Sequence, residues 1–168
     1  IWSSKRLQIF VPSELQNTTL GIIGYGGIGQ EIAHLASAFG MKILVTKRDT
    51  SEPSINSWQF PNPSIIQHDF VEKLYLPEHL HIMLKHCDYV VAAVPLTRNT
   101  KHMISSSEFS AMKKGTILVN ISRGKVVDEL ALIDALQSDH LRGAILDVFE
   151  TEPLDAKSPL WELPNVII

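Results

Sequence analysis

The sequence predicts an α/β fold in which helices cover both faces of a doubly wound parallel sheet. Short apolar runs of strand length alternate with segments of helical periodicity from residue 19 onward. The segment 88–94 contains an unbroken apolar run, as expected for a strand that is covered on both faces. A glycine-rich turn also connects the first strand directly to a helix, which is the arrangement of a β-α-β unit.

The glycine turn has the spacing G-x-G-x-x-G, formed by Gly24, Gly26 and Gly29. In this geometry Gly24 allows the sharp turn, Gly26 leaves space for a pyrophosphate, and Gly29 lets the helix pack closely on the strand. The helix directs its N–H groups and the positive end of its dipole toward the same pyrophosphate. The turn therefore predicts a Rossmann-type dinucleotide site at Gly24, Gly26, Gly27, Ile28 and Gly29.

The elements around this turn follow from periodicity and from turn residues. The first helix ends at Gly40, and a second strand follows at residues 41–46. Residues 1–16 predict a connecting segment, residues 48–69 a polar and proline-rich loop, and residues 73–76 a third strand. The apolar residues of the first helix fall on one face and are Ile28, Ile32, Leu35, Ala36 and Phe39.

The second half of the chain continues the alternation. Pro77 opens a helix, Ser105 and Glu108 form a capping box at the start of another, and Asp128 caps a third. Apolar runs predict buried strands at residues 88–94, 115–120, 143–148 and 165–168.

Composition narrows the class of protein. The chain has 168 residues, of which 45% are hydrophobic and 20% charged, which suits one domain with a full core. A formal charge of −3 argues against nucleic acid and anionic membrane as partners. Cys87 is the single cysteine, so an internal disulfide is excluded and a reducing compartment is expected. We expect a cytoplasmic protein, because no apolar run reaches membrane-spanning length.

The two ends of the sequence suggest a larger protein. The chain begins at Ile1 without a methionine and stops within the apolar run 165–168. We therefore expect residues 1–168 to be one NAD(P)-binding domain within a longer polypeptide that also has a substrate lobe.

Ligands of doubly wound sheets bind beyond the carboxyl ends of the strands, and six ordered motifs gather there. They are GYGGIG at 24–29, VPLT at 94–97 with Thr100, MKKG at 112–115, NISRG at 120–124, AILDVF at 144–149 and EPL at 152–154. Together they resemble the nucleotide-binding domain of the D-isomer-specific 2-hydroxyacid dehydrogenases. The resemblance covers nearly the whole chain from residue 20.

This resemblance implies an oxidoreductase that passes a hydride between a nicotinamide cofactor and a 2-oxo acid or D-2-hydroxy acid. Arg123 matches the arginine that holds the substrate, and a guanidinium fork suits a carboxylate. Glu152 matches the acid that orients a catalytic histidine and raises its pKa. The resemblance further implies cofactor contacts by Val94, Pro95, Thr100, Ile121, Ser122 and Asp147.

The sequence departs from the family pattern in two places. The family's histidine follows the final apolar strand, whereas all seven histidines here precede Glu152, so we expect this chain alone to be inactive. NAD-dependent relatives carry an acid after the second strand, where this sequence has Lys47 and Arg48. Two cations there favour NADP over NAD, although Asp49 would restore the acid if the register shifted.

The sequence leaves other functions open. The same resemblance extends to co-repressors that sense nicotinamide redox state, and to dehydrogenases that act on formate, phosphite or an amino acid. No metal site is expected. The resemblance also implies a homodimer, with which the apolar residues Ile1, Trp2, Leu160 and Trp161 are compatible.

Overall fold

A computed structural model describes residues 14–48 and 70–168 of the chain. Their strands form one parallel sheet in the order β3-β2-β1-β4-β5-β6-β7, and the predicted fold class is confirmed. The strands are β1 (Thr19–Ile23), β2 (Lys42–Thr46), β3 (Val71–Tyr75), β4 (Tyr89–Ala92), β5 (Thr116–Asn120), β6 (Leu141–Leu146) and β7 (Val166–Ile167).

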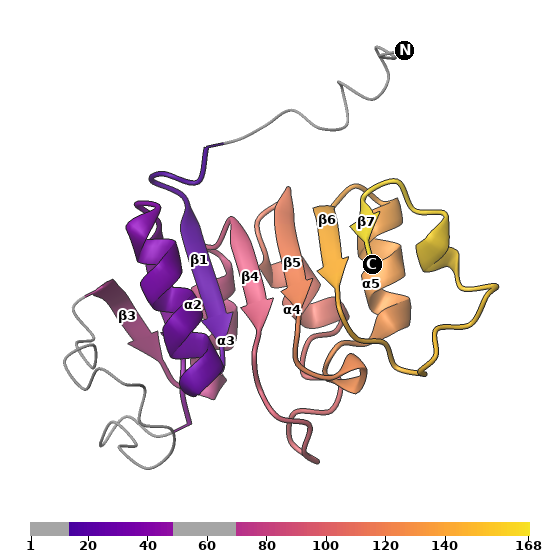
Figure 1. Cartoon of the computed structure of the whole chain (residues 1–168), viewed down its shortest axis with the longest axis horizontal. Coiled ribbons are helices and arrows are strands. Elements are labelled where there is room, and N and C mark those ends of the chain that lie inside the picture. The colour runs from indigo at the N-terminus through magenta and orange to yellow at the C-terminus, as the bar shows by residue number, and fades with distance from the viewer. Residues whose placement is uncertain (1–13, 49–69) are drawn as a thin grey trace.

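Helices cover both faces of the sheet. They are α2 (Gly27–Ala38), α3 (Leu80–Leu84), α4 (Ser106–Ala111) and α5 (Glu129–Gln137), with short 3-10 turns η3 (Pro77–His79), η4 (Gly124–Val126) and η5 (Pro159–Trp161). Figure 1 shows α2 in front of β1, with α3, α4 and α5 behind the sheet. Two core clusters follow this division: a smaller one under α2 and a larger one beneath the other three helices.

The buried side of α2 differs from the predicted one. The helix forms where periodicity places it, but Ile28, Leu35 and Phe39 are 64%, 53% and 62% exposed. Of the predicted face, Ala36 is buried and Ile32 is half-buried against the smaller core cluster, and Gly29 and Ala33 complete the buried side. Small side chains on this side let the helix axis lie close to β1, so the larger apolar residues remain on the outer side.

The predicted capping devices are present in the second half. The amide of Ser105 donates to Glu108 Oε2 at 2.9 Å, and the Asp128 carboxylate accepts from the Ala131 amide at 3.1 Å. Burial favours a higher pKa for Glu108, but hydrogen bonds from His81, Ser105 and Ser107 outweigh burial, so its pKa is lowered. The start of α4 therefore depends on an ionised carboxylate.

The last two strands differ in detail from the prediction. β6 begins and ends earlier than predicted, so Asp147 follows the strand. β7 is a short edge strand, and its Ile167 is 56% exposed. Ile145, its register partner, is 40% exposed on the same face of the sheet, so the prediction of a buried strand was wrong there. No described helix covers that part of the face (Figure 1).

Candidate functional site

The predicted site residues gather along one edge of the sheet. All arrowheads in Figure 1 point toward the same edge, so the loops after β1, β2, β4, β5 and β6 meet there. The order in which the chain adds strands reverses at β1, which pairs in parallel with β2 on one side and with β4 on the other. A crevice between the loops after β1 and β4 is the usual ligand position in such a sheet.

The glycine turn has the geometry that its spacing predicts. Gly24 has φ +99°, and a Cβ there would lie 2.7 Å from the carbonyl oxygen of Ala93. A Cβ on Gly29 would overlap the carbonyl oxygen of Gly24, so helix and turn are in direct backbone contact. A Cβ on Gly26 or on Gly27 would meet nothing within 4 Å. The fold itself thus requires glycine at positions 24 and 29, but not at positions 26 and 27.

The open space at Gly26 lies at the N-terminus of α2. Among residues 14–48 and 70–168, no side chain caps this helix, whose cap residue is Gly26 itself. The N–H groups of its first turn therefore lack a side-chain acceptor, and the helix dipole favours a negative charge beside them. Gly27 and Ile28 are exposed at the same turn. The residues present fit the pyrophosphate of a dinucleotide.

Tyr25 anchors this turn, a role that sequence analysis did not assign. Its side chain is 4% exposed and belongs to the smaller core cluster with Ala33 and Val45. Burial raises the pKa of Tyr25 above its ordinary value. An aromatic residue between two glycines of the motif was the only sequence signal for it.

The loop after β4 is held by hydrogen bonds between its own residues. Thr100 Oγ1 donates to the Pro95 carbonyl at 2.6 Å and accepts from the Thr97 amide at 2.8 Å. Val94 is half-buried against the larger core cluster, and Pro95 is exposed. The Thr100 hydroxyl thus shapes the loop.

The loop after β5 is held from within by Asn120, which is 1% exposed. Its Oδ1 accepts from the Ser122 amide at 3.1 Å and from the Ser122 hydroxyl at 2.7 Å. Its Nδ2 donates to the Arg123 carbonyl at 3.4 Å. Arg123 is exposed, and its Nη1 donates to the Ser122 carbonyl at 2.7 Å. Buried amide contacts thus fix Ser122, while Ile121 packs against the smaller core cluster.

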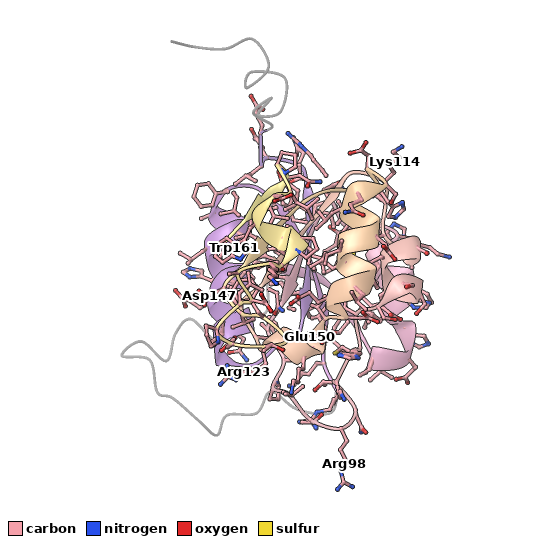
Figure 2. The ribbon with its side chains drawn as sticks, turned by 90° about the vertical axis from the view of Figure 1, so that its right-hand side faces the viewer. Arg98, Lys114, Arg123, Asp147, Glu150 and Trp161 are labelled. Atoms are coloured by element: carbon pink, nitrogen blue, oxygen red, sulfur yellow. The ribbon has the colours of Figure 1, made fainter. Side chains whose placement is uncertain are left out.

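Asp147 and Glu152 lie on the loop after β6. The Asp147 amide donates to the Asn120 carbonyl at 3.1 Å, and the residue is exposed directly after β6. Glu152 is exposed, and its Oε1 accepts from the Phe149 amide at 3.0 Å. In Figure 2, Arg123 and Glu150 lie in the lower part of the molecule, at the end opposite Lys114.

Two cations directly follow β2. Lys47 is half-buried, and its amide donates to the Tyr75 carbonyl at 3.1 Å, whereas Arg48 is exposed. The predicted alternative acid, Asp49, lies outside the described residues. The Thr46 hydroxyl accepts from the Gly24 amide at 3.2 Å, so the end of β2 adjoins the glycine turn.

No described histidine hydrogen-bonds or ion-pairs with Glu152. His81 pairs with Glu108 at 2.7 Å, His102 with Glu150 at 2.8 Å, and His140 Nε2 contacts the Phe109 carbonyl at 2.8 Å. The same part of the chain contains no group of three His, Cys, Asp or Glu side chains that could hold a metal. None of its helices has the length and apolarity needed to cross a bilayer.

Of the two described residues suggested as dimer contacts, Leu160 departs from that expectation and Trp161 does not. Leu160 is 1% exposed and belongs to the larger core cluster, so it is not available to a partner. Trp161 is 54% exposed, with its indole N–H on the Asp155 carbonyl at 3.0 Å. Ile1 and Trp2 lie outside the described residues.

Comparison with known proteins points to one family of dehydrogenases. A family model described as the D-isomer specific 2-hydroxyacid dehydrogenase, NAD binding domain, matches residues 2–168. A glyoxylate reductase of Thermococcus gammatolerans is 43% identical over 160 residues, which are 95% of this chain and 43% of that protein. A glyoxylate/hydroxypyruvate reductase B of Serratia proteamaculans is 40% identical over 155 residues, covering 92% of this chain and 43% of that protein.

A solved structure shares the fold as well. It is the NADPH-dependent glyoxylate/hydroxypyruvate reductase of Sinorhizobium meliloti in complex with NADP and sulfate, with 28% identity and a TM-score of 0.78. The match covers 94% of this chain and 46% of that one. The chain thus spans somewhat less than half the length of these relatives.

Proposed function

Because the chain belongs to the D-isomer-specific 2-hydroxyacid dehydrogenase family, we propose that it is the cofactor-binding part of an NAD(P)-dependent oxidoreductase. The enzyme interconverts a 2-oxo acid and a D-2-hydroxy acid. The observation that carries this proposal is the open, uncapped N-terminus of α2 at Gly26, on the same sheet edge as the loops after β5 and β6, which contain Arg123 and Glu152. A dinucleotide and a carboxylate substrate would meet between these loops.

The cofactor would lie along the carboxyl edge of the sheet. Its pyrophosphate would contact the N–H groups from Gly26 to Gly29, where a Cβ at Gly26 would have open space. The loops of Val94, Pro95 and Thr100 would border it, with Ile121, Ser122 and Asp147 nearer the nicotinamide. The bound nicotinamide supplies or accepts the hydride. The chain's own residues orient the two reactants and stabilise charge.

Arg123 would hold the substrate. Its exposed guanidinium stands on a loop whose backbone Asn120 fixes, so its position is defined. Its Nη1 donates to the Ser122 carbonyl, which leaves the other N–H groups of the guanidinium to bind a ligand. A guanidinium binds a carboxylate with two parallel hydrogen bonds and stabilises negative charge that develops on the carbonyl oxygen.

We expect Arg123→Ala in the complete protein to reduce kcat/KM for glyoxylate at least about a hundredfold, because a charged transition-state contact is lost. The Kd for NAD(P)H should change less than about twofold. Lys114→Ala, which removes an exposed cation at the opposite end of the molecule, serves as the control. Unchanged turnover in Arg123→Ala would refute this role.

Glu152 would orient a histidine that acts as the proton donor. The histidine would come from a segment outside residues 1–168, as part of a larger protein with a substrate lobe. The lack of any described histidine on Glu152 supports this arrangement. We therefore expect no reductase activity from residues 1–168 alone and clear activity from the complete protein. Turnover of glyoxylate by the isolated chain would contradict the assignment.

NADP is the cofactor we favour. Lys47 and Arg48 follow β2 beside the glycine turn, where the adenosine ribose of a dinucleotide lies in such folds. A 2′-phosphate would pair with the Arg48 guanidinium. Arg48→Ala should weaken NADPH binding about tenfold and NADH binding much less, measured by fluorescence titration. Lys42→Ala, at the other end of β2, should alter neither affinity.

We also propose a cytoplasmic homodimer for the complete protein. The outer side of α2 exposes Leu35 and Phe39, and a second copy of the chain would bury these side chains. Light scattering after size exclusion should give twice the subunit mass. A monomer over the whole concentration range would rule out the dimer.

A further inference from the structure

Three loops of the carboxyl edge meet at one small cluster beside the proposed catalytic residues. We define the Glu150 junction as His102, Gly124, Glu129, Phe149 and Glu150. His102 belongs to the loop after β4, Gly124 and Glu129 follow β5, and Phe149 and Glu150 follow β6. None of these residues has a role in the proposed function so far.

The first contact of the junction is between two backbones. A Cβ on Gly124 would overlap the carbonyl group of Phe149 and the amide of Glu150. The loop after β6 therefore packs directly against the residue that follows Arg123. Only a residue without a side chain allows this approach.

The second contact is a reciprocal pair of hydrogen bonds. The Glu129 amide donates to Glu150 Oε1 at 3.2 Å, and the Glu150 amide donates to Glu129 Oε2 at 3.3 Å. Each carboxylate thus accepts from the other residue's backbone. The bonds join the first turn of α5 to the loop after β6, and the dipole of α5 favours acidic side chains at its N-terminus.

The third contact brings in a histidine from the loop after β4. His102 Nε2 lies 2.8 Å from Glu150 Oε1, and the two groups form an ion pair only when the imidazole is protonated. The contact does not meet hydrogen-bond geometry. The amide of His102 donates to the Lys125 carbonyl at 2.8 Å, and its φ is +50°. His102 therefore joins the loop after β4 to the Glu150 carboxylate.

The junction bears directly on Glu152. The Phe149 amide, next to Glu150, is the donor that holds Glu152 Oε1 at 3.0 Å. The carbonyl of the same Phe149 packs on Gly124, the neighbour of Arg123. A shift of the junction would therefore move Glu152 relative to Arg123.

We propose that His102 and Glu129 are positioning residues, which hold the Glu152 carboxylate in place relative to Arg123 by clamping Glu150. This inference rests on the proposed function for its catalytic consequence. Misplacement of a catalytic group by about 1 Å can reduce a rate about a hundredfold. Loss of the clamp should therefore lower turnover while cofactor binding at Gly26, on another loop, is unaffected.

The test uses His102→Ala, Glu129→Gln and the conservative His102→Gln in the complete protein. His102→Ala should lower kcat for glyoxylate at least about tenfold and change the Kd for NADPH less than about twofold. His102→Gln, which keeps a side-chain N–H but cannot carry a charge, should recover only part of the loss. His81→Ala is the matched control, because it breaks a histidine–glutamate pair of 2.7 Å between α3 and α4. It should leave kcat unchanged.

Amide hydrogen exchange gives a readout that does not depend on activity. In His102→Ala the amides of Phe149 and Glu150 should exchange at least about tenfold faster, while those of β1 stay protected. Wild-type protein without any 2-oxo acid activity would refute the proposed function, and the exchange data would still decide on the clamp. Wild-type exchange and wild-type kcat in both His102→Ala and Glu129→Gln would overturn the inference. Should His102→Ala fail to fold, Glu150→Gln tests the same contact.

Discussion

The glycine turn allows the requirements of folding to be separated from those of binding. Gly29→Ala would place a Cβ onto the carbonyl oxygen of Gly24 and 3.3 Å from Ile22 Cγ2. The oxygen belongs to the backbone and cannot rotate away, so α2 would have to move outward by about 1 Å. Overpacking of this kind costs roughly 1–3 kcal/mol, and the better helix propensity of alanine returns about 1 kcal/mol. Because the overlap is with a backbone atom, we expect the upper part of that cost and hence a net loss of about 1–2 kcal/mol in the free energy of unfolding.

Gly26→Ala should leave the stability of the fold nearly unchanged and weaken cofactor binding. A Cβ there meets no atom within 4 Å, and the φ of −87° is accessible to alanine. The free energy of unfolding should therefore change by about 0.5 kcal/mol or less. The methyl group would occupy the space proposed for the pyrophosphate, so the Kd for NADPH should rise at least about tenfold, or about 1.4 kcal/mol.

The assay pairs urea unfolding, followed by circular dichroism, with fluorescence titration of NADPH on both variants. Each variant is the control for the other, because the substitution is the same and only the position differs. Wild-type stability of Gly29→Ala would refute the argument from close packing. Wild-type affinity of Gly26→Ala would refute the placement of the pyrophosphate.

Three further predictions concern other positions. The lowered pKa of Glu108 stabilises the fold above the unfolded pKa of about 4.5, and this stabilisation is lost as the pH falls through the folded pKa. The urea midpoint of Glu108→Gln should consequently fall less than that of wild type between about pH 7 and about pH 4. Burial raises the pKa of Cys87 to about 12, with a smaller opposing effect of Lys113, so a thiol reagent should label Cys87 only in unfolded protein; rapid labelling of the native chain would contradict this. Gly124→Ala should lower the Tm by several degrees, because its Cβ would overlap the Phe149 carbonyl, and an unchanged Tm would argue against that contact.

Local signals explain what could be predicted. Gly24 needs a positive φ, the Asp128 carboxylate caps a helix by accepting from an amide three residues on, and Ser105 with Glu108 forms a capping box within one turn. Each of these depends on neighbours in the chain, so the residue types alone identify them. The strand-end positions of Arg123 and Asp147 followed from the same local reading combined with the rule for parallel sheets.

Other features depend on residues far apart in the chain. Ala36 was predicted on the buried face of α2 and is buried, but Ile28, Leu35 and Phe39 of that face are exposed, and Gly29 and Ala33 are buried beside Ala36 because the helix approaches β1 at Gly29. Leu160 looked like a surface contact and is buried in the larger core cluster. The hydrophobic pattern of a sequence predicts that a helix has an apolar face, but it does not predict how closely that face packs against the sheet.

The sequence by itself determined the fold class, the dinucleotide turn and the loops that carry the candidate residues, since these depend on periodicity, glycine spacing and caps within one or two turns of chain. Only the tertiary structure decided which side of α2 is buried, how Asn120 shapes the loop of Arg123, and how the Glu150 junction joins His102 to Glu129. These contacts span strands and loops that the sheet alone brings together, and no spacing along the chain encodes them.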